Sequence, residues 1–182
     1  MSDERVAITL TINGRPETGF APPRMLLSDF LRQQLGYTGV HVGCEHGVCG
    51  ACTILLDGAP VRSCLMFAVQ LEGANVTTIE GIAGPERMHP VQEAFKTNHG
   101  LQCGFCTPGM VLTAIDFLNR NADPDATSVR EAMSGNLCRC TGYEGIVAAV
   151  LDAAATMKQA DQKNTTNRET VTWNIRERRN SD

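Results

Sequence analysis

The chain has 182 residues, a hydrophobic fraction of 42% and a formal net charge of −4. This length allows one or two small domains with cores of their own, and the ordinary apolar content is untypical of disordered or membrane-spanning chains. Acidic and basic residues are mixed, so the sequence lacks the basic face that nucleic-acid binding needs. We therefore expect neither nucleic acid nor a membrane as a partner.

The cysteine content points to metal chemistry. The N-terminus lacks a positively charged segment followed by an apolar stretch, so we expect no secretory signal and a cytoplasmic location. The chain nevertheless contains eight cysteines. In a reducing compartment this number favours metal binding or catalysis over disulfides.

The first half of the chain predicts an α+β unit with a mixed sheet. Residues 6–12 alternate and are rich in β-branched side chains, which indicates a strand. Asn13-Gly14 is a strong hairpin turn, and a return strand runs to about Phe20. The remaining predicted elements are a helix over 26–35 that ends at Gly36, and strands over 53–56 and 76–79.

A first cysteine motif lies between that helix and the strand at 53–56. Its spacing is Cys44-x4-Cys49-x2-Cys52, and Cys64 follows further along, which is the plant-type [2Fe–2S] pattern. Such a loop must curl so that backbone N–H groups face the sulfurs, and its glycines allow this. The alternatives are a structural zinc site or disulfides. Zinc sites usually pair two short C-x(2–4)-C hooks, whereas three of these cysteines share one loop.

The second half of the chain predicts a small helical bundle. A Gly/Pro-containing connection over 81–87 suggests a domain boundary. Thr107 is expected to cap one helix, with Pro108 in its first turn, and Ser128-x-x-Glu131 reads as a capping box closed by Gly135. The predicted helices cover about 90–98, 108–119, 128–134 and 142–157.

A second set of cysteines lies in the loops of this bundle. Cys103-x2-Cys106 and Cys138-x-Cys140 each lie between two helices, and antiparallel packing would bring both loops to the same end. Helix dipoles favour negative charge near a helix N-terminus, which suits thiolates. The spacing alone leaves two possibilities open, a second [2Fe–2S] cluster and a zinc ion.

The last residues differ in composition from the rest. From about residue 159 the chain is dominated by Gln, Asn, Thr, Asp and Lys, which predicts a disordered tail. Val171, Trp173 and Ile175 alternate with polar residues, so this stretch could instead lie extended along a partner subunit.

Three motifs together carry a resemblance. The segments Gly43-Cys-Glu-His-Gly-Val-Cys-Gly-Ala-Cys-Thr53, Gln102-Cys-Gly-Phe-Cys-Thr-Pro-Gly109 and Gly135-Asn-Leu-Cys-Arg-Cys-Thr-Gly-Tyr143 resemble the small iron–sulfur subunit of molybdenum hydroxylases. This is the xanthine oxidase family, in the separate-subunit form of carbon monoxide dehydrogenase-type enzymes. The resemblance covers about residues 4–158, with the motifs in the family's order.

The resemblance implies an α+β fold with two domains. These are an N-terminal β-grasp, ferredoxin-like [2Fe–2S] domain over 4–80 and an all-α, four-helix [2Fe–2S]-binding domain over 85–158, followed by a polar tail over 159–182. All eight cysteines become cluster ligands: Cys44, Cys49, Cys52 and Cys64 in the first domain, and Cys103, Cys106, Cys138 and Cys140 in the second. Gln102 and Cys140 match positions that contact molybdopterin.

The resemblance also implies a function. Electrons would pass singly from the molybdopterin-bound molybdenum of a large subunit, through the two clusters, to FAD in a medium subunit. The assembly would be a heterotrimer or a dimer of heterotrimers. No substrate-converting residue is expected in this chain, and the substrate pocket belongs to the large subunit. The alternatives are a freestanding two-cluster ferredoxin for another reductase and a zinc-binding interaction module.

Overall fold

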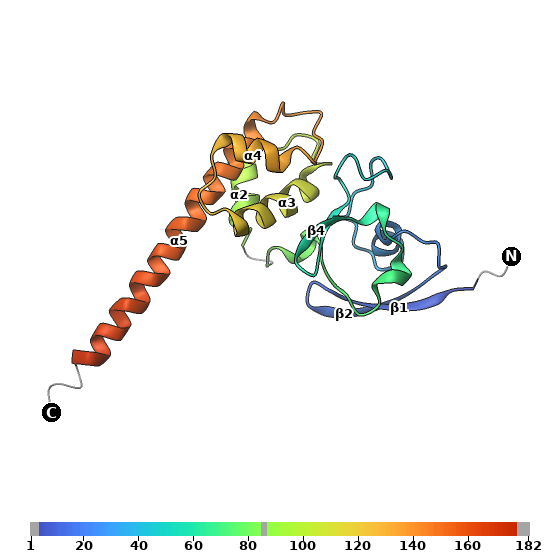
Figure 1. Ribbon diagram of the computed structural model, residues 1–182, viewed down its shortest axis with the longest axis horizontal. Coiled ribbons are helices and arrows are strands. Elements are labelled where there is room, and N and C mark those ends of the chain that lie inside the picture. The colour runs from blue at the N-terminus through green and yellow to red at the C-terminus, as the bar shows by residue number, and fades with distance from the viewer. Residues whose placement is uncertain (1–3, 85–86, 178–182) are drawn as a thin grey trace.

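The computed structural model describes residues 4–84 and 87–177. Figure 1 shows a body built on a sheet near the N-terminus and a helical body beside it, from which one long helix extends. The expected α+β fold is confirmed, with a ferredoxin-like unit followed by a helical one.

The first body contains a mixed five-stranded sheet. The strands are β1 (Val6–Ile12), β2 (Arg15–Ala21), β3 (Thr53–Leu56), β4 (Ala59–Arg62) and β5 (Asn75–Thr77). Their order is β2-β1-β5-β3-β4; β1 and β5 are parallel, and the other neighbours are antiparallel. Asn13 and Gly14, both with positive φ, make the tight turn between β1 and β2 that the sequence predicts.

Short helical segments complete the core of this body. The helix predicted over 26–35 forms as a single α turn, α1 (Leu27–Asp29), that continues as a π-helical segment, η1 (Phe30–Gln34). Phe30 and Leu31 are buried against the sheet residues Ile8 and Leu10. Three 3-10 segments follow: η2 (Ser63–Leu65), η3 (Ala68–Leu71) and η4 (Ile79–Gly81).

One strand was not expected from the sequence. β4 contains Pro60, which cannot donate a backbone hydrogen bond, and residues 57–58 before it form a turn. Proline is tolerated in a sheet mainly at an edge, and β4 is an edge strand that pairs only with β3. Its partner β3 lies further inside the sheet, and the consecutive apolar residues Ile54, Leu55 and Leu56 make it easier to recognise as a strand.

The second body is the four-helix unit that the sequence predicts. Its helices are α2 (Pro90–Thr97), α3 (Thr107–Arg120), α4 (Ala126–Met133) and α5 (Glu144–Glu177). Their inward faces form one core, separate from that of the sheet. Its largest fully buried side chains are Phe95, Met110, Met133 and Ile146.

Two predicted helix caps are wrong. Thr107 lies inside α3, whose N-cap is Cys106, and the buried Thr107 hydroxyl has no hydrogen-bond partner among the described residues. α4 is capped by Asp125, whose carboxylate accepts a hydrogen bond from the Ser128 N–H at 2.8 Å. Asp125 is the stronger cap because its side chain reaches a free N–H of the first turn, whereas Ser128 already lies inside the helix.

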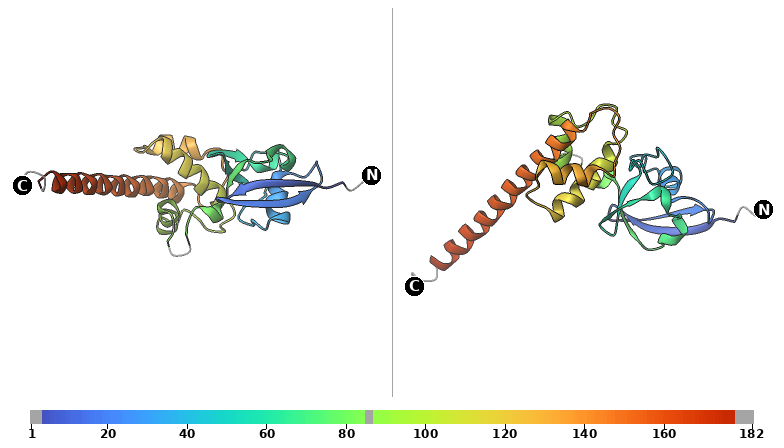
Figure 2. Two further views of the ribbon diagram at one scale, coloured as in Figure 1. Left: turned by 90° about the horizontal axis from the view of Figure 1, so that it is seen from below. Right: turned by 45° about the horizontal axis from the view of Figure 1, so that its top comes forward.

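The last helix is longer than predicted. α5 begins at Glu144, close to the predicted start at about residue 142, but its backbone stays helical to Glu177, so the stretch 171–175 is helical and neither disordered nor extended. The sequence contains neither Gly nor Pro after Gly145, so nothing in it stops a helix. In Figures 1 and 2 the second half of α5 extends beyond the bundle.

Hydropathy gives one further result. Among the residues that the structure describes, no helix is both long enough and apolar enough to cross a membrane.

Candidate iron–sulfur centres

The first cysteine set surrounds a tightly curled loop. The backbone N–H groups of His46 and Cys49 both donate to Cys44 Sγ, each at 3.4 Å. Glu45 and Gly47 have positive φ, which turns these N–H groups inward. The loop therefore has the curled geometry that the sequence predicts, with backbone donors facing the Cys44 sulfur.

The protonation of these thiols is set by those donors and by burial. Hydrogen bonds from the N–H groups of Cys49 and His46 lower the pKa of Cys44 to about 6. Burial, and then a hydrogen bond with Cys52, raise the pKa of Cys64 to about 11. A thiolate is therefore already favoured at one position of the set. Because iron binds thiolates, loading the site would release the remaining protons.

The second cysteine set lies where the two loops of the bundle meet. Cys103 and Cys106 precede α3, Cys138 and Cys140 precede α5, and the sulfurs of Cys103 and Cys140 are 3.5 Å apart. The Sγ of Cys138 lies 3.3 Å from the Thr141 hydroxyl. The antiparallel bundle thus brings both loops to one end, as the sequence predicts.

The pKa values of this set show the same contrast. The Phe105 N–H lowers the pKa of Cys103, whereas burial, and then a hydrogen bond with Cys138, raise the pKa of Cys106 to about 12. Burial alone would raise the pKa of Cys138, but the Thr141 hydroxyl and the Cys140 N–H together lower it. Four neighbouring thiols that shift one another's pKa suit a group that binds all four and replaces their protons.

Several residues that support the cysteine loops were missed by sequence reasoning. The Tyr143 hydroxyl accepts a hydrogen bond from the Cys138 N–H at 2.9 Å and donates to the Asn136 carbonyl at 3.1 Å. Ser63 donates from its hydroxyl to the Cys52 carbonyl at 2.8 Å. The only signal for them was their position within or beside a cysteine motif.

The two cysteine loops touch each other across the domain boundary. The Leu137 N–H donates to the Cys49 carbonyl at 2.8 Å, which joins the loop of one set to the loop of the other. Nearby, the His41 ring stacks on Phe105 with centroids 4.9 Å apart, and His41 Nδ1 lies 2.7 Å from the Phe105 carbonyl. The sequence did not predict these contacts.

Each set also has an exposed side. Cys103 and Cys140 are exposed, as is Gln102 beside them. Large apolar side chains are exposed around both sets: Leu101, Phe105 and Leu137 near the second, and Val48 and Leu65 near the first. Each cysteine set can therefore be approached from solvent on this exposed side.

The donor sets fit two [2Fe–2S] clusters. Each consists of four thiols, and backbone N–H groups are directed at sulfur in both loops. Among the described residues, no group of three or more His, Cys, Asp or Glu side chains has the arrangement that would hold a single metal ion.

Comparisons with known proteins agree with this geometry. The chain matches the family described as "2Fe-2S iron-sulfur cluster binding domain" over residues 10–77 and that described as "[2Fe-2S] binding domain" over residues 78–151. It is 53% identical to the nicotine 6-hydroxylase small subunit of Paenarthrobacter nicotinovorans, over 82% of this chain and 90% of that protein. It is 51% identical to the caffeine dehydrogenase subunit gamma of Pseudomonas sp. (strain CBB1), over 84% and 93%.

A solved structure shows the same fold. The quinoline 2-oxidoreductase from Pseudomonas putida 86 contains a chain that is 50% identical and superimposes with a TM-score of 0.82, over 87% of this chain and 98% of that one. Two matched [2Fe–2S] domains and relatives of this identity and coverage establish the family. The chain belongs to the small [2Fe–2S] iron–sulfur subunits of the molybdenum hydroxylase family.

Proposed function

We propose that the chain is the electron-transfer subunit of a molybdenum-containing hydroxylase or dehydrogenase. It would pass electrons singly from the molybdopterin centre of a large subunit to FAD in a medium subunit. The observation that carries the proposal is the hydrogen bond between the two cysteine loops, from the Leu137 N–H to the Cys49 carbonyl. It brings the two cysteine loops into contact within one chain, and an internal relay needs its two sites close together.

The ligand assignment is part of this proposal. Cys44, Cys49, Cys52 and Cys64 would hold one [2Fe–2S] cluster, and Cys103, Cys106, Cys138 and Cys140 the other. Each cluster, when bound, accepts and releases one electron. The chain's own contribution is to direct N–H groups at the sulfurs, which tunes the reduction potential, and to bury part of each site.

The exposed surfaces suggest where each partner docks. We assign the surface with Gln102, Cys103 and Cys140 to the large subunit, with Gln102 and Cys140 near molybdopterin. The exposed apolar side chains of Leu101, Phe105 and Leu137 support this, because such groups mark protein interfaces. Val48 and Leu65, beside the first set, would face the FAD subunit. The expected assembly is a heterotrimer or a dimer of heterotrimers.

Sequence similarity to the relatives does not indicate which substrate the complex acts on. The chain is 51% identical to a caffeine dehydrogenase subunit and 50% identical to part of an aldehyde oxidoreductase of Megalodesulfovibrio gigas. Equal identity to proteins named for such different compounds is expected if the substrate pocket lies in another subunit. We further propose domain limits of 4–80 and 85–158. We also propose a cytoplasmic location, because eight thiols stay reduced there.

Copurification and spectroscopy test this function. The tagged full chain is expected to copurify with molybdenum- and FAD-containing chains and to show two distinct [2Fe–2S] EPR signals after reduction. Two signals without partner chains would favour the freestanding ferredoxin. Stoichiometric zinc without acid-labile sulfide would contradict both the electron-transfer subunit and the freestanding ferredoxin, and would favour the zinc-binding module.

A further inference from the structure

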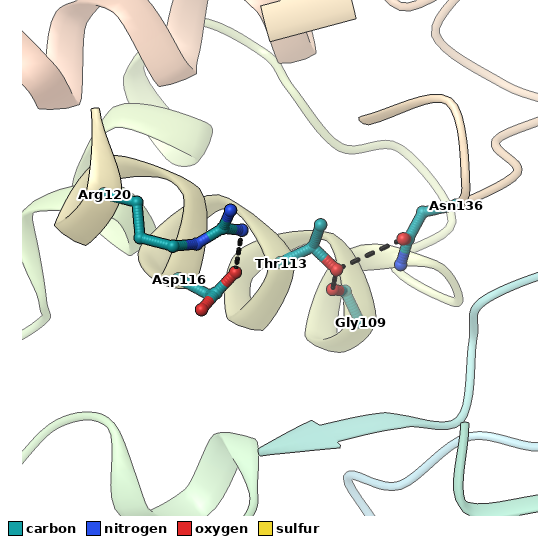
Figure 3. A network of polar contacts seen from close by, with 5 residues as sticks. All are labelled: Gly109, Thr113, Asp116, Arg120 and Asn136. Carbon is teal, nitrogen blue, oxygen red and sulfur yellow. Dashed lines mark hydrogen bonds and ion pairs between the residues drawn. The ribbon is translucent and has the colours of Figure 1, made fainter. Parts of the chain in front are cut away.

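A buried amide lies at the centre of the contact between the two domains. Asn136 is only 1% exposed, although it belongs to the loop between α4 and α5. Its Nδ2 donates to the Gly50 carbonyl at 3.1 Å and lies 3.4 Å from the Thr53 hydroxyl. Its Oδ1 lies 3.1 Å from the Thr113 hydroxyl on α3. Figure 3 shows these two side chains pointing toward each other. One side chain therefore ties the sheet domain to two segments of the helical domain.

Arg62 holds this amide from the opposite domain. Its guanidinium extends from β4 and donates to the Thr53 hydroxyl and to the Gly135 carbonyl, both at 2.6 Å. It also donates to Asn136 Oδ1 at 3.2 Å. A planar guanidinium can make these bonds together because its donors are fixed in one plane. The amide is thus locked in orientation, with donor and acceptor ends both engaged.

Two glycines let the backbones meet at this contact. A Cβ on Gly109 would lie 2.3 Å from the Gly50 carbonyl oxygen, and a Cβ on Gly50 would lie 2.7 Å from the Gly135 carbonyl oxygen. Neither glycine position has room for a side chain. The domains are therefore in direct backbone contact at this point, and Asn136 fixes their alignment.

The simplest explanation of Asn136 is a buried polar group that is merely satisfied, as most are. Three of its four partners, however, lie within two residues of proposed cluster ligands: Gly50 and Thr53 beside Cys49 and Cys52, and Arg62 two residues before Cys64. Gly50 lies between Cys49 and Cys52, and Asn136 itself lies two residues before Cys138. Gly109, which accepts a hydrogen bond from Thr113 at 2.8 Å, lies three residues after Cys106. A shift of this amide would therefore move ligand loops of both sites.

We propose that Asn136, held by Arg62, is the positioning residue that fixes the distance and orientation between the two clusters. The inference rests on the proposed function. In the step that it would serve, one electron would leave the reduced cluster held by the helical domain, which would become oxidised, and would reduce the cluster held by the sheet domain. No bond forms or breaks and no proton moves. The rate of this step depends on a separation that Asn136 maintains.

The test is pulsed EPR on the full chain reduced with dithionite, which measures the magnetic coupling between the two clusters without partner subunits or substrate. Asn136→Ala and Arg62→Gln are compared with the wild type. Asn98→Ala is the matched control, because Asn98 Nδ2 donates only within the helical domain, to the Ala94 carbonyl and to Asp152. Iron and sulfide contents are measured for every variant.

We expect Asn136→Ala and Arg62→Gln to keep both clusters but to lose the single sharp coupling, which becomes a broad distribution. Inter-cluster electron transfer, followed after rapid reduction, should slow in both, while Asn98→Ala should match the wild type. Unchanged coupling in fully loaded Asn136→Ala and Arg62→Gln overturns the proposal. If Asn136→Ala fails to fold, the magnetic coupling measured in Arg62→Gln tests the proposal by itself. A wild type without two [2Fe–2S] signals would instead refute the proposed function.

Discussion

The Leu137 N–H and the Cys49 carbonyl form a 2.8 Å hydrogen bond between the loops of the two cysteine sets. The Leu137 side chain is 52% exposed, so solvent reaches the residue even though its amide is engaged. Protection of this amide therefore reports on the contact between domains and not on burial of the residue.

Hydrogen exchange should reveal this bond. The Leu137 amide is expected to exchange far more slowly than in an unfolded peptide of the same sequence, because exchange requires the domains to separate locally. Mass spectrometry with fragmentation, or NMR on the iron-free chain, can resolve the single amide. Exchange at the peptide rate in a folded chain would mean that the loops do not stay in contact.

Single ligand substitutions should separate the two sites. Cys64→Ser is expected to remove the cluster of the sheet domain, and Cys138→Ser that of the helical domain, because each site has only four thiols. Each variant should contain about half the iron and acid-labile sulfide of the wild type and lose a different EPR signal. The two variants serve as controls for one another. If either lost all of its iron, the sites would not be independent.

The glycine contact between the domains predicts a steric effect. Gly109→Ala would place a methyl group 2.3 Å from the Gly50 carbonyl oxygen. Overpacking of this kind typically costs about 1–3 kcal/mol, which outweighs the gain of roughly 1 kcal/mol from alanine in a helix. Chemical unfolding should therefore show a lower free energy of unfolding. Gly84→Ala is the control, since a Cβ there has no neighbour within 4 Å; equal stability of the two variants would contradict the contact.

His89 predicts a dependence of stability on pH. Its Nδ1 accepts a hydrogen bond from the Val91 N–H at 3.2 Å and so caps α2, and burial lowers the pKa of its imidazole below 6.5. The unfolded state then binds the proton more readily, so this contribution to stability is complete above pH 6.5 and is lost as the pH falls below it. Thermal unfolding at several pH values measures this loss.

His89→Asn provides the comparison for that experiment. Asparagine retains a side-chain acceptor for the first turn of α2 but does not titrate in this range. The variant is expected to lose less stability than the wild type between pH 7 and about pH 5.5. If the two proteins lost stability in parallel, other groups would account for the acid sensitivity.

Local patterns predicted much of the fold and of the candidate site. Alternation identified β1, and Asn13-Gly14 identified its turn, because both signals lie within a few residues of each other. The cysteine spacings were informative for the same reason. The C-terminal limit of α5 was not predictable from composition, since polar residues occur both in disordered tails and in exposed helices.

The contact between the domains could not be predicted in this way. Asn136 and Gly50 are 86 positions apart, and an asparagine beside a glycine normally indicates only a turn. Likewise, nothing near Arg62 in the sequence indicates that its guanidinium reaches Gly135, 73 positions away. Such partners emerge only when two independent cores are placed against one another.

The loop that contains Asn136 and Cys138 has a consequence for biogenesis. The same few residues include proposed ligands of the second site and close the contact between the domains. Coupling free energies are reciprocal, so filling that site favours docking by as much as docking favours filling it. Maturation of the helical domain and its docking onto the sheet domain should therefore be coupled.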